Sequence, residues 1–347
     1  MAEQDQVTLE WFGATTFRLR ANGLTMFLDT WLDRPKVMPV YLAIDQVKEA
    51  DYIFISHAHF DHLPGADRLA KQTGAIVIAN GEAITCLREA GVPEDQLLPV
   101  AGGERIPLFT KAVRDQAKAG TISRAPGPPL APPLPDVSHA AMSVHCWPSL
   151  HALLPGRSHA DIPDEMDTAQ VYEGASPYAC TLDITRGMRY GLLRLNEFVP
   201  EDHLDAGERS FIEYISDRQQ NILSNFDGGQ IMYNFLLGDR TIMYNAHLGA
   251  YRGILEHIEP KPDVLIQAIA GRANIDGRPY DGSAAQASTM ICKLLGEPKQ
   301  VIWCLHDEGV IKPWRIKTDA ATKMVESETG SRIVNLEPKE LYTVFGT

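Results

Sequence analysis

The sequence predicts an α/β protein built in layers. Short runs rich in β-branched and aromatic residues recur along the chain, and helical stretches that end at Gly or Pro separate them. The same alternation returns after a long polar middle segment. Strands that alternate with helices are typical of sheets covered by helices. With 347 residues and 44% hydrophobic residues, the chain has ample material for a large core.

The first part of the chain contains a hairpin followed by alternating strands and helices. Asn22-Gly23 is a hairpin turn signal between two apolar runs, and Gly91 and Pro93 end the second helix. Strands are predicted at residues 7–12, 16–20, 24–28, 51–56 and 75–79, and helices at 64–73 and 81–90.

The middle of the chain has a different composition. Six prolines fall within residues 120–137, which excludes a helix or a central strand there and predicts a loop or strap. Residues 155–227 are polar and irregular. We therefore predict one domain over residues 1–347, with an insertion or lid at about 105–228.

The strand pattern returns after Gly229. Gly238-Asp239 is the turn of a second predicted hairpin, and Gly296 and Pro298 follow a helix. Strands are predicted at residues 231–237, 240–244, 263–270, 301–305, 332–336 and 341–345, and helices at 284–295 and 320–328.

Composition excludes several classes of protein. The chain has 32 basic and 45 acidic residues, a net charge of −13, so nucleic acid is not an expected partner. Five cysteines without a CxxC pair exclude a disulfide scaffold or a Cys-rich zinc module. We see no secretory signal and no apolar run of roughly 20 residues. These features predict a soluble cytoplasmic protein with no membrane partner, with a homo-oligomer left open.

One segment, Ser56 to His62, carries a concentrated set of metal-ligand side chains. It reads SHAHFDH and follows the apolar strand at residues 51–56 directly. His57 and His59 are two residues apart, so in extended backbone they point the same way and can share one metal ion. Asp61 and His62 project toward an adjacent point. The spacing therefore predicts two neighbouring sites with N and O ligands, suited to zinc or a similar divalent ion.

This HAHFDH segment resembles the HxHxDH signature of the metallo-β-lactamase fold superfamily. Other landmarks follow in order: Asp29 in Leu-Asp-Thr, His151 in Pro-Ser-Leu-His, His247 in Tyr-Asn-Ala-His-Leu-Gly, and His306 after an apolar strand. Among subgroups, the chain most resembles the lactonase-like branch related to ascorbate-6-phosphate lactonase and N-acyl-ethanolamine phospholipase.

The resemblance implies an αββα sandwich with metals at one edge. Carried over residue by residue, the first site is His57, His59 and His151, and the second is Asp61, His62 and His306. His145 and His159 compete with His151. Asp29 is implied to support the metal loop, and Asp307 is placed to orient a ligand imidazole or to contact substrate.

One position departs from the family pattern. The family usually bridges its two metals with an aspartate, where this chain has His247, or Asn245 if the alignment slips by two. A neutral imidazole can bind one metal but cannot bridge two as a carboxylate does. His247 is therefore predicted to bind one metal or to face the substrate, and one or two metals are expected, zinc first, with manganese or iron as alternatives.

The predicted function is a metal-dependent hydrolase. A metal-bound hydroxide would attack a small cyclic amide or ester, a lactam or lactone, with Asp61 and His247 as catalytic residues. Aromatic residues near the ligand segments would wall the pocket or pack in the core: Trp147, Tyr233, Trp303 and Trp314. The alternatives are a phosphodiesterase or phospholipase-type hydrolase and, in another class, a non-catalytic or redox metal-binding protein on the same fold.

Overall fold

Two seven-stranded sheets face each other in the computed structural model, which describes residues 6–153, 165–174, 179–307 and 315–345. The first sheet has the order β21 (Leu341–Phe345), β1 (Val7–Trp11), β2 (Phe17–Ala21), β3 (Leu24–Leu28), β4 (Tyr52–Phe54), β5 (Ile76–Ala79) and β6 (Leu97–Pro99). The second has the order β20 (Arg332–Val334), β18 (Gln300–Cys304), β14 (Val264–Ala268), β12 (Arg240–Asn245), β11 (Ile231–Leu237), β8 (Met142–Pro148) and β7 (Arg105–Leu108).

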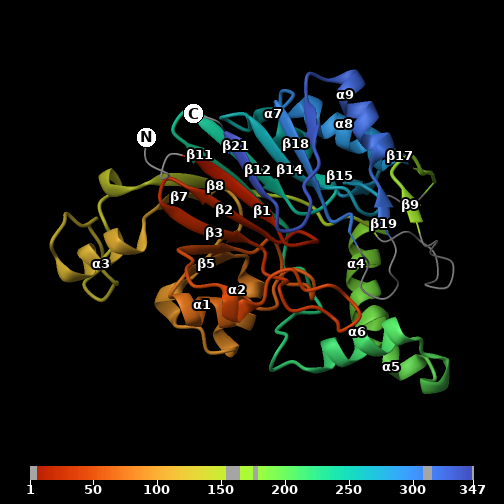
Figure 1. The fold of residues 1–347 in the computed structure, drawn as a ribbon, viewed down its shortest axis with the longest axis horizontal. Coiled ribbons are helices and arrows are strands. Elements are labelled where there is room, and N and C mark those ends of the chain that lie inside the picture. Colours follow the sequence, from red (N-terminus) through yellow and green to blue (C-terminus); the bar gives the residue numbers. More distant parts are fainter. Residues whose placement is uncertain (1–5, 154–164, 175–178, 308–314, 346–347) are drawn as a thin grey trace.

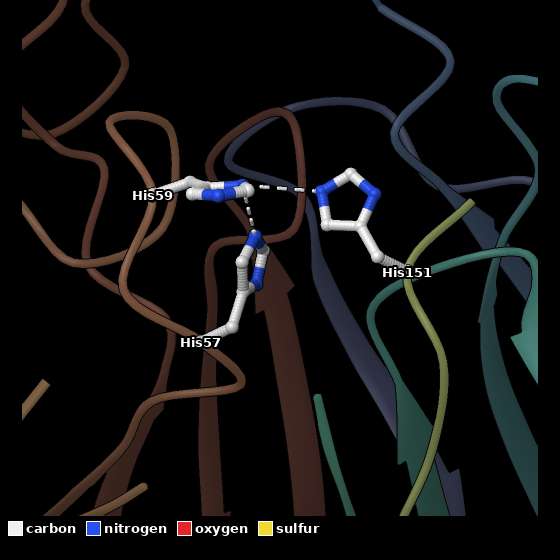
Figure 2. Close-up of side chains that lie close together, drawn as sticks. All are labelled: His57, His59 and His151. Atoms are coloured by element: carbon white, nitrogen blue, oxygen red, sulfur yellow. Dashed lines mark hydrogen bonds between the residues drawn. The ribbon is translucent and has the colours of Figure 1, made fainter. Parts of the chain in front are cut away.

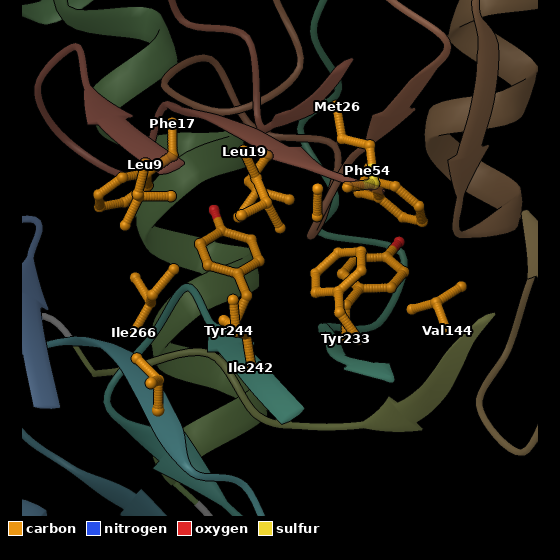
Figure 3. Close-up of a cluster of buried hydrophobic side chains, with 14 of the residues drawn as sticks. Leu9, Phe17, Leu19, Met26, Phe54, Val144, Tyr233, Ile242, Tyr244 and Ile266 are labelled. Atoms are coloured by element: carbon orange, nitrogen blue, oxygen red, sulfur yellow. The ribbon is translucent and has the colours of Figure 1, made fainter. Parts of the chain in front are cut away.

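The main core lies between the two sheets (Figure 3). In β1 and β2 buried residues alternate with half-buried ones, which is the period of a strand with one face inward. Leu9 and Leu19 from the first sheet face Tyr244 and Ile266 from the second. The two sheets therefore share one apolar layer that fixes how their edges align.

Helices cover the outer faces of both sheets (Figure 1). Helices α1 (Ala66–Thr73) and α2 (Gly81–Glu89) pack on the first sheet, and α7 (Arg252–His257), α8 (Ala284–Leu294) and α9 (Asp319–Glu328) pack on the second. The layers are therefore helix, sheet, sheet and helix, which confirms the predicted αββα sandwich.

The predicted insertion at about 105–228 contains regular structure. Strands β7 and β8 belong to the second sheet, and α3 (Lys111–Ala119), α4 (Ala179–Tyr190), α5 (Leu195–Phe198) and α6 (Ala206–Ser216) also lie in this stretch. Helix α6 begins at a capping box, in which Asp205 accepts from the backbone of Glu208. That D-x-x-E spacing is a helix-start signal readable in the sequence. Helices α4 to α6 form one group at the lower right of Figure 1.

Short strands complete the described structure: β9 (Glu165–Asp167), β10 (Val171–Tyr172), β13 (Gly249–Ala250), β15 (Asn274–Ile275), β16 (Arg278–Pro279), β17 (Gly282–Ser283) and β19 (Arg315–Lys317). The two predicted hairpins are present, because β2 pairs with β3 and β11 pairs with β12 in antiparallel register. Within the described ranges, no helix combines the length and the apolar character needed to cross a membrane.

Candidate metal centre

The histidine-rich segment begins where β4 ends, at the edge of the sandwich. The backbone oxygens of Ser56, Ala58 and His62 accept hydrogen bonds from neighbouring segments, at 2.8–2.9 Å. The side chains of His57, His59 and His62 are at most 1% exposed. The loop is thus held from several sides, which limits where its imidazoles can point.

The first group of possible ligands is His57, His59 and His151. His59 Nδ1 lies 3.1 Å from His57 Nε2 and 3.2 Å from His151 Nε2 (Figure 2). His151 Nδ1 donates to the carbonyl oxygen of Ala152 at 2.6 Å, which leaves the lone pair on Nε2. Three ring nitrogens thus converge on one point. They belong to the residues that the resemblance implies for the first site, and metal binding by them stays a prediction.

The second group is His57, His62 and His247. The ring of His247 stacks on His151, with centroids 3.7 Å apart and planes 29° apart. Neither nitrogen of His247 has a hydrogen-bond partner, and the same is true of Nε2 in His59 and His62. Unpaired polar atoms at this depth are costly, and a metal ion would satisfy them. The nitrogen donor set therefore fits zinc or a similar divalent ion.

Asp29 anchors the loop that carries His57, His59 and His62. The residue sits directly after β3 with φ of 49°. Its Oδ1 accepts from the Ser56 amide at 2.7 Å, and its Oδ2 accepts from His62 Nδ1 at 2.6 Å. Tyr244 Oη and Thr15 Oγ1 also donate to Oδ2, at 2.6 and 2.8 Å. A carboxylate behind an imidazole fixes the ring and its tautomer, so Nε2 of His62 is the nitrogen left for a metal.

Burial keeps most of these imidazoles neutral. It lowers the pKa of His57, His59 and His247 well below the usual value, and the neighbouring histidines lower it further. Burial also lowers the pKa of His151. His62 differs: burial opposes its charge, but Asp61 and Asp29 outweigh that effect and raise its pKa to about 10. Four of the five imidazoles are therefore ready to bind metal without losing a proton.

Asp61 and His306 lie outside both histidine groups. Asp61 Oδ2 is 3.4 Å from His62 Nε2, and its side chain is 19% exposed. His306 follows β18 as expected, but its ring stacks on Trp11 with centroids 4.8 Å apart. Metal binding by these two residues stays a prediction.

Asp307 contacts neither histidine group. It pairs with Arg34 at 3.1 Å and accepts from the backbone amide of Ala14 at 2.8 Å. Arg34 also donates to the carbonyl oxygen of Phe12. Asp307 thus anchors the chain after β18 to the turn after β1.

The aromatic residues predicted as pocket walls are mostly core residues. Tyr233 is fully buried between the sheets and donates to the carbonyl oxygen of Ile55 at 2.7 Å. Trp303 is 2% exposed, packs under the helices and donates to Thr322. Both side chains therefore follow the core-packing alternative, because strand alternation turns them into the core. Trp147 is half-buried against the same helix-side core, and Trp314 lies outside the described residues.

Of the two competing histidines, only His145 lies in the described part of the chain, and it does not join the site. His145 is on β8 opposite Asn234 and belongs to neither group, and His159 lies outside the described residues. Sequence reasoning missed Tyr244, Thr15 and Ser56 as partners of Asp29. A tyrosine or hydroxyl residue carries no spacing signal for such a role, because its partner is distant in the chain.

The insertion helices also contact the metal-binding loop. Phe60, between His59 and Asp61, packs edge-on against Phe211 of α6, with ring centroids 5.1 Å apart. Tyr214 of α6 donates to the carbonyl oxygen of Phe60 at 3.2 Å and accepts from Trp31 Nε1 at 3.0 Å. Helix α6 therefore supports the segment that carries the ligands.

Comparisons with known proteins agree with this architecture. Residues 25–127 match the model of a family described as the Beta-lactamase superfamily domain. A UPF0173 metal-dependent hydrolase of Anaeromyxobacter sp. is 38% identical over 96 residues, 27% of this chain and 35% of that protein. Another from Pyrobaculum islandicum is 35% identical over 100 residues, 29% of this chain and 44% of that protein. The matches thus span less than half of these relatives' own length.

A solved structure extends the likeness over nearly the whole chain. A metallo hydrolase of the archaeon Ignicoccus hospitalis superposes with a TM-score of 0.55 and 17% identity, and covers 99% of this chain and all of that one. At this identity the likeness concerns the fold. The chain therefore has the metallo-β-lactamase fold, and its residues 25–127 are similar to the β-lactamase superfamily domain.

Proposed function

We propose that the protein is a metal-dependent hydrolase, with zinc as the expected metal, that opens a small cyclic amide or ester. The observation that carries the proposal is the convergence of five buried imidazoles in two overlapping groups, His57–His59–His151 and His57–His62–His247. Relatives named as metal-dependent hydrolases support the same reaction class.

The two groups would hold one or two metal ions. A bound divalent metal lowers the pKa of its water to about 7 and polarises a carbonyl or phosphoryl oxygen. The protein supplies the proton carriers around it. Asp61 has a pKa held below its usual value, since His62 and its neighbours outweigh the effect of burial. Its free carboxylate oxygen can accept a hydrogen bond from the attacking water and orient it.

In this proposal His247 donates a hydrogen bond to the leaving group or to the tetrahedral oxyanion. A neutral imidazole has one lone pair and one N–H group. One nitrogen of His247 can therefore bind metal while the other donates to the oxygen that gains charge. Both nitrogens are without partners in the described structure, so neither role requires breaking an existing hydrogen bond.

Local charge favours a neutral substrate over a phosphodiester. Arg34, one of the cations beside the chain after β18, is already paired with Asp307. Asp61 and Asp227 place negative charge near His151. A lactam or lactone brings no charge into this surrounding, whereas a phosphodiester brings one that these carboxylates repel.

A proton-release assay on a panel of lactams, lactones and phosphodiesters tests the proposal. We expect turnover of a lactam or lactone that stops with a chelator, returns with zinc, and is lost in His59→Ala. His257→Ala, an exposed histidine on α7, is the matched control and should keep full activity. Turnover of phosphodiesters alone would favour the alternative substrate class, and activity that survives complete metal removal would refute the metal-dependent mechanism.

A further inference from the structure

Three buried polar side chains form a network behind the second histidine group. Ser149, Asn245 and Gln267 are 5%, 1% and 0% exposed. Asn245 and Gln267 are paired on the parallel strands β12 and β14. Ser149 Oγ donates to Asn245 Oδ1 at 3.0 Å, and Asn245 Nδ2 donates to Gln267 Oε1 at 3.1 Å. We call these three residues the buried amide network.

The network is hydrogen-bonded to the turn that follows β12 and carries His247. Gln267 Nε2 donates to the carbonyl oxygen of His247 at 3.0 Å. Ser149 Oγ also lies 2.9 Å from the carbonyl oxygen of Gly249, and Asn245 Nδ2 lies 3.2 Å from the same oxygen. The carbonyl oxygens of His247 and Gly249 are therefore held by Gln267 on β14, by Ser149 just after β8 and by Asn245 at the end of β12.

Two further contacts join this turn to the segment that carries His151. An added Cβ at Gly249 would lie 2.0 Å from the carbonyl oxygen of Leu150, so the two backbones touch and position 249 requires glycine. Asn274 Nδ2 donates to the carbonyl oxygen of His151 at 3.0 Å. The stacking of the His247 and His151 rings, at 3.7 Å, follows from this backbone contact.

The position of the network in the sheet is unusual. Met243 and Leu265 sit two residues earlier on the same strands and belong to the apolar core under the helices. Amide side chains in such a layer destabilise the fold unless every donor and acceptor is paired. The pairing found here connects to a turn that carries a candidate ligand, so the network has a role beyond filling the core.

We propose that Ser149, Asn245 and Gln267 are positioning residues that hold His247 against His151 and thereby preform the second metal-binding group. This inference rests on the proposed function, because it assigns the network to the metal centre. The network sets the backbone of the turn, and the backbone sets the direction of the imidazole.

Titration of the metal-free full-length chain with Co²⁺ tests the proposal. We expect Gln267→Met to bind the first Co²⁺ ion as the wild type does and the second about 10–100-fold more weakly, with an altered visible spectrum. Asn234→Leu is the matched control: it is a fully buried amide on β11 of the same sheet, and its Nδ2 donates to Pro260 instead. It should bind both ions normally.

Hydrogen exchange of the metal-free protein gives a second readout. Peptides covering residues 245–251 should exchange faster in Gln267→Met than in wild type or Asn234→Leu. If Gln267→Met does not fold, Ser149→Ala removes a single hydroxyl and should shift both measurements in the same direction. Unchanged affinity for the second ion and unchanged exchange in a folded variant would overturn the inference.

Failure of the proposed function is distinguishable from failure of this inference. A wild-type chain that takes up no Co²⁺ would refute the metal-dependent hydrolase itself. In that case the exchange experiment would still show whether the network holds the His247 turn. Normal Co²⁺ binding by both wild type and Gln267→Met would leave the hydrolase standing and remove the network from the metal centre.

Discussion

The segments after β4 and after β18 behave differently although they look alike in the sequence. Each follows a buried strand, and each was predicted to carry metal ligands. After β4, the imidazoles of His57, His59 and His62 turn inward and join the histidine groups. After β18, the chain turns at Leu305 with φ of 56°, and His306 stacks on Trp11. A strand end thus places a side chain at the edge of the sheet, but tertiary contacts decide its direction.

Different hydrogen bonds hold the two segments. In the segment after β4, Asp29 accepts hydrogen bonds from the amide of Ser56 and the ring of His62. The second segment is anchored by Asp307, which pairs with Arg34, and by the amide of Leu305, which donates to Ala14 at 2.9 Å. The first anchor leaves imidazole nitrogens free to converge, and the second holds the chain against β1.

The largest difference is expected between two histidine variants, one in the segment after β4 and one in the segment after β18. His59→Ala should abolish metal-dependent turnover and remove one metal ion per chain, because His59 Nδ1 lies between two other ligand nitrogens. His306→Ala should keep the metal content of the wild type. Elemental mass spectrometry and the proton-release assay measure both effects. Loss of an ion in His306→Ala would show that this histidine moves into the site, as the sequence predicted.

The next effect concerns the anchor under the first segment. Asp29→Asn should weaken metal binding about 10–100-fold, since the imidazole of His62 loses the carboxylate that orients it. Asp51→Asn is the matched control: this carboxylate also accepts backbone amides, from Thr25 and Lys111, but it lies away from the histidines. A metal titration compares the two variants. Equal affinities would show that Asp29 supports the fold without tuning the ligands.

Removing the other anchor should lower stability more than metal binding. Arg34→Met leaves Asp307 without its partner, and the Arg34 side chain is only 1% exposed. We expect a loss of about 3 kcal/mol in the free energy of unfolding, read from urea denaturation. Lys36→Met is the control, because Lys36 pairs with Glu213 in an exposed ion pair and should change stability little. A loss of metal ions in Arg34→Met would tie the segment after β18 to the metal centre.

The last prediction concerns the pH dependence of the metal-free protein, in which no single residue is changed. Below pH about 6.5 the histidines of the unfolded chain take up protons, whereas four buried histidines of the folded chain stay neutral. These are His57, His59, His151 and His247. The free energy of unfolding should therefore decrease as the pH is lowered. Above pH about 6.5, His62 stays protonated in the folded chain up to its pKa of about 10, while the same histidine in the unfolded chain is neutral. The free energy of unfolding should therefore decrease as the pH rises toward 10.

Urea denaturation with a chelator across this range measures the profile. A maximum near neutral pH is expected. His247→Gln should make the acid side shallower, because one of the four groups is gone, while the exposed His257→Gln should leave it unchanged. A profile that keeps rising toward pH 9 in the wild type would contradict the ion pair of His62 with its two carboxylates.

Much of the fold was predictable because it depends on local patterns. The hairpin at Asn22-Gly23, the strand before the histidines and the helix at residues 284–295 each follow from turn residues, alternation or capping. The helices α4 and α6 were missed, since their stretch is polar overall and only the Asp205–Glu208 capping box signals one of them.

The sequence by itself determined the α/β class, most strands of the two large sheets and the histidine segment that begins the metal centre, because these depend on residues close together in the chain. Only the tertiary structure decided that His247 stacks on His151, that Tyr244 supports Asp29, and that His306 lies against Trp11. Those choices depend on residues that are far apart in the chain and meet only when the two sheets pack. Hydrogen bonds and close packing then select one direction for each side chain.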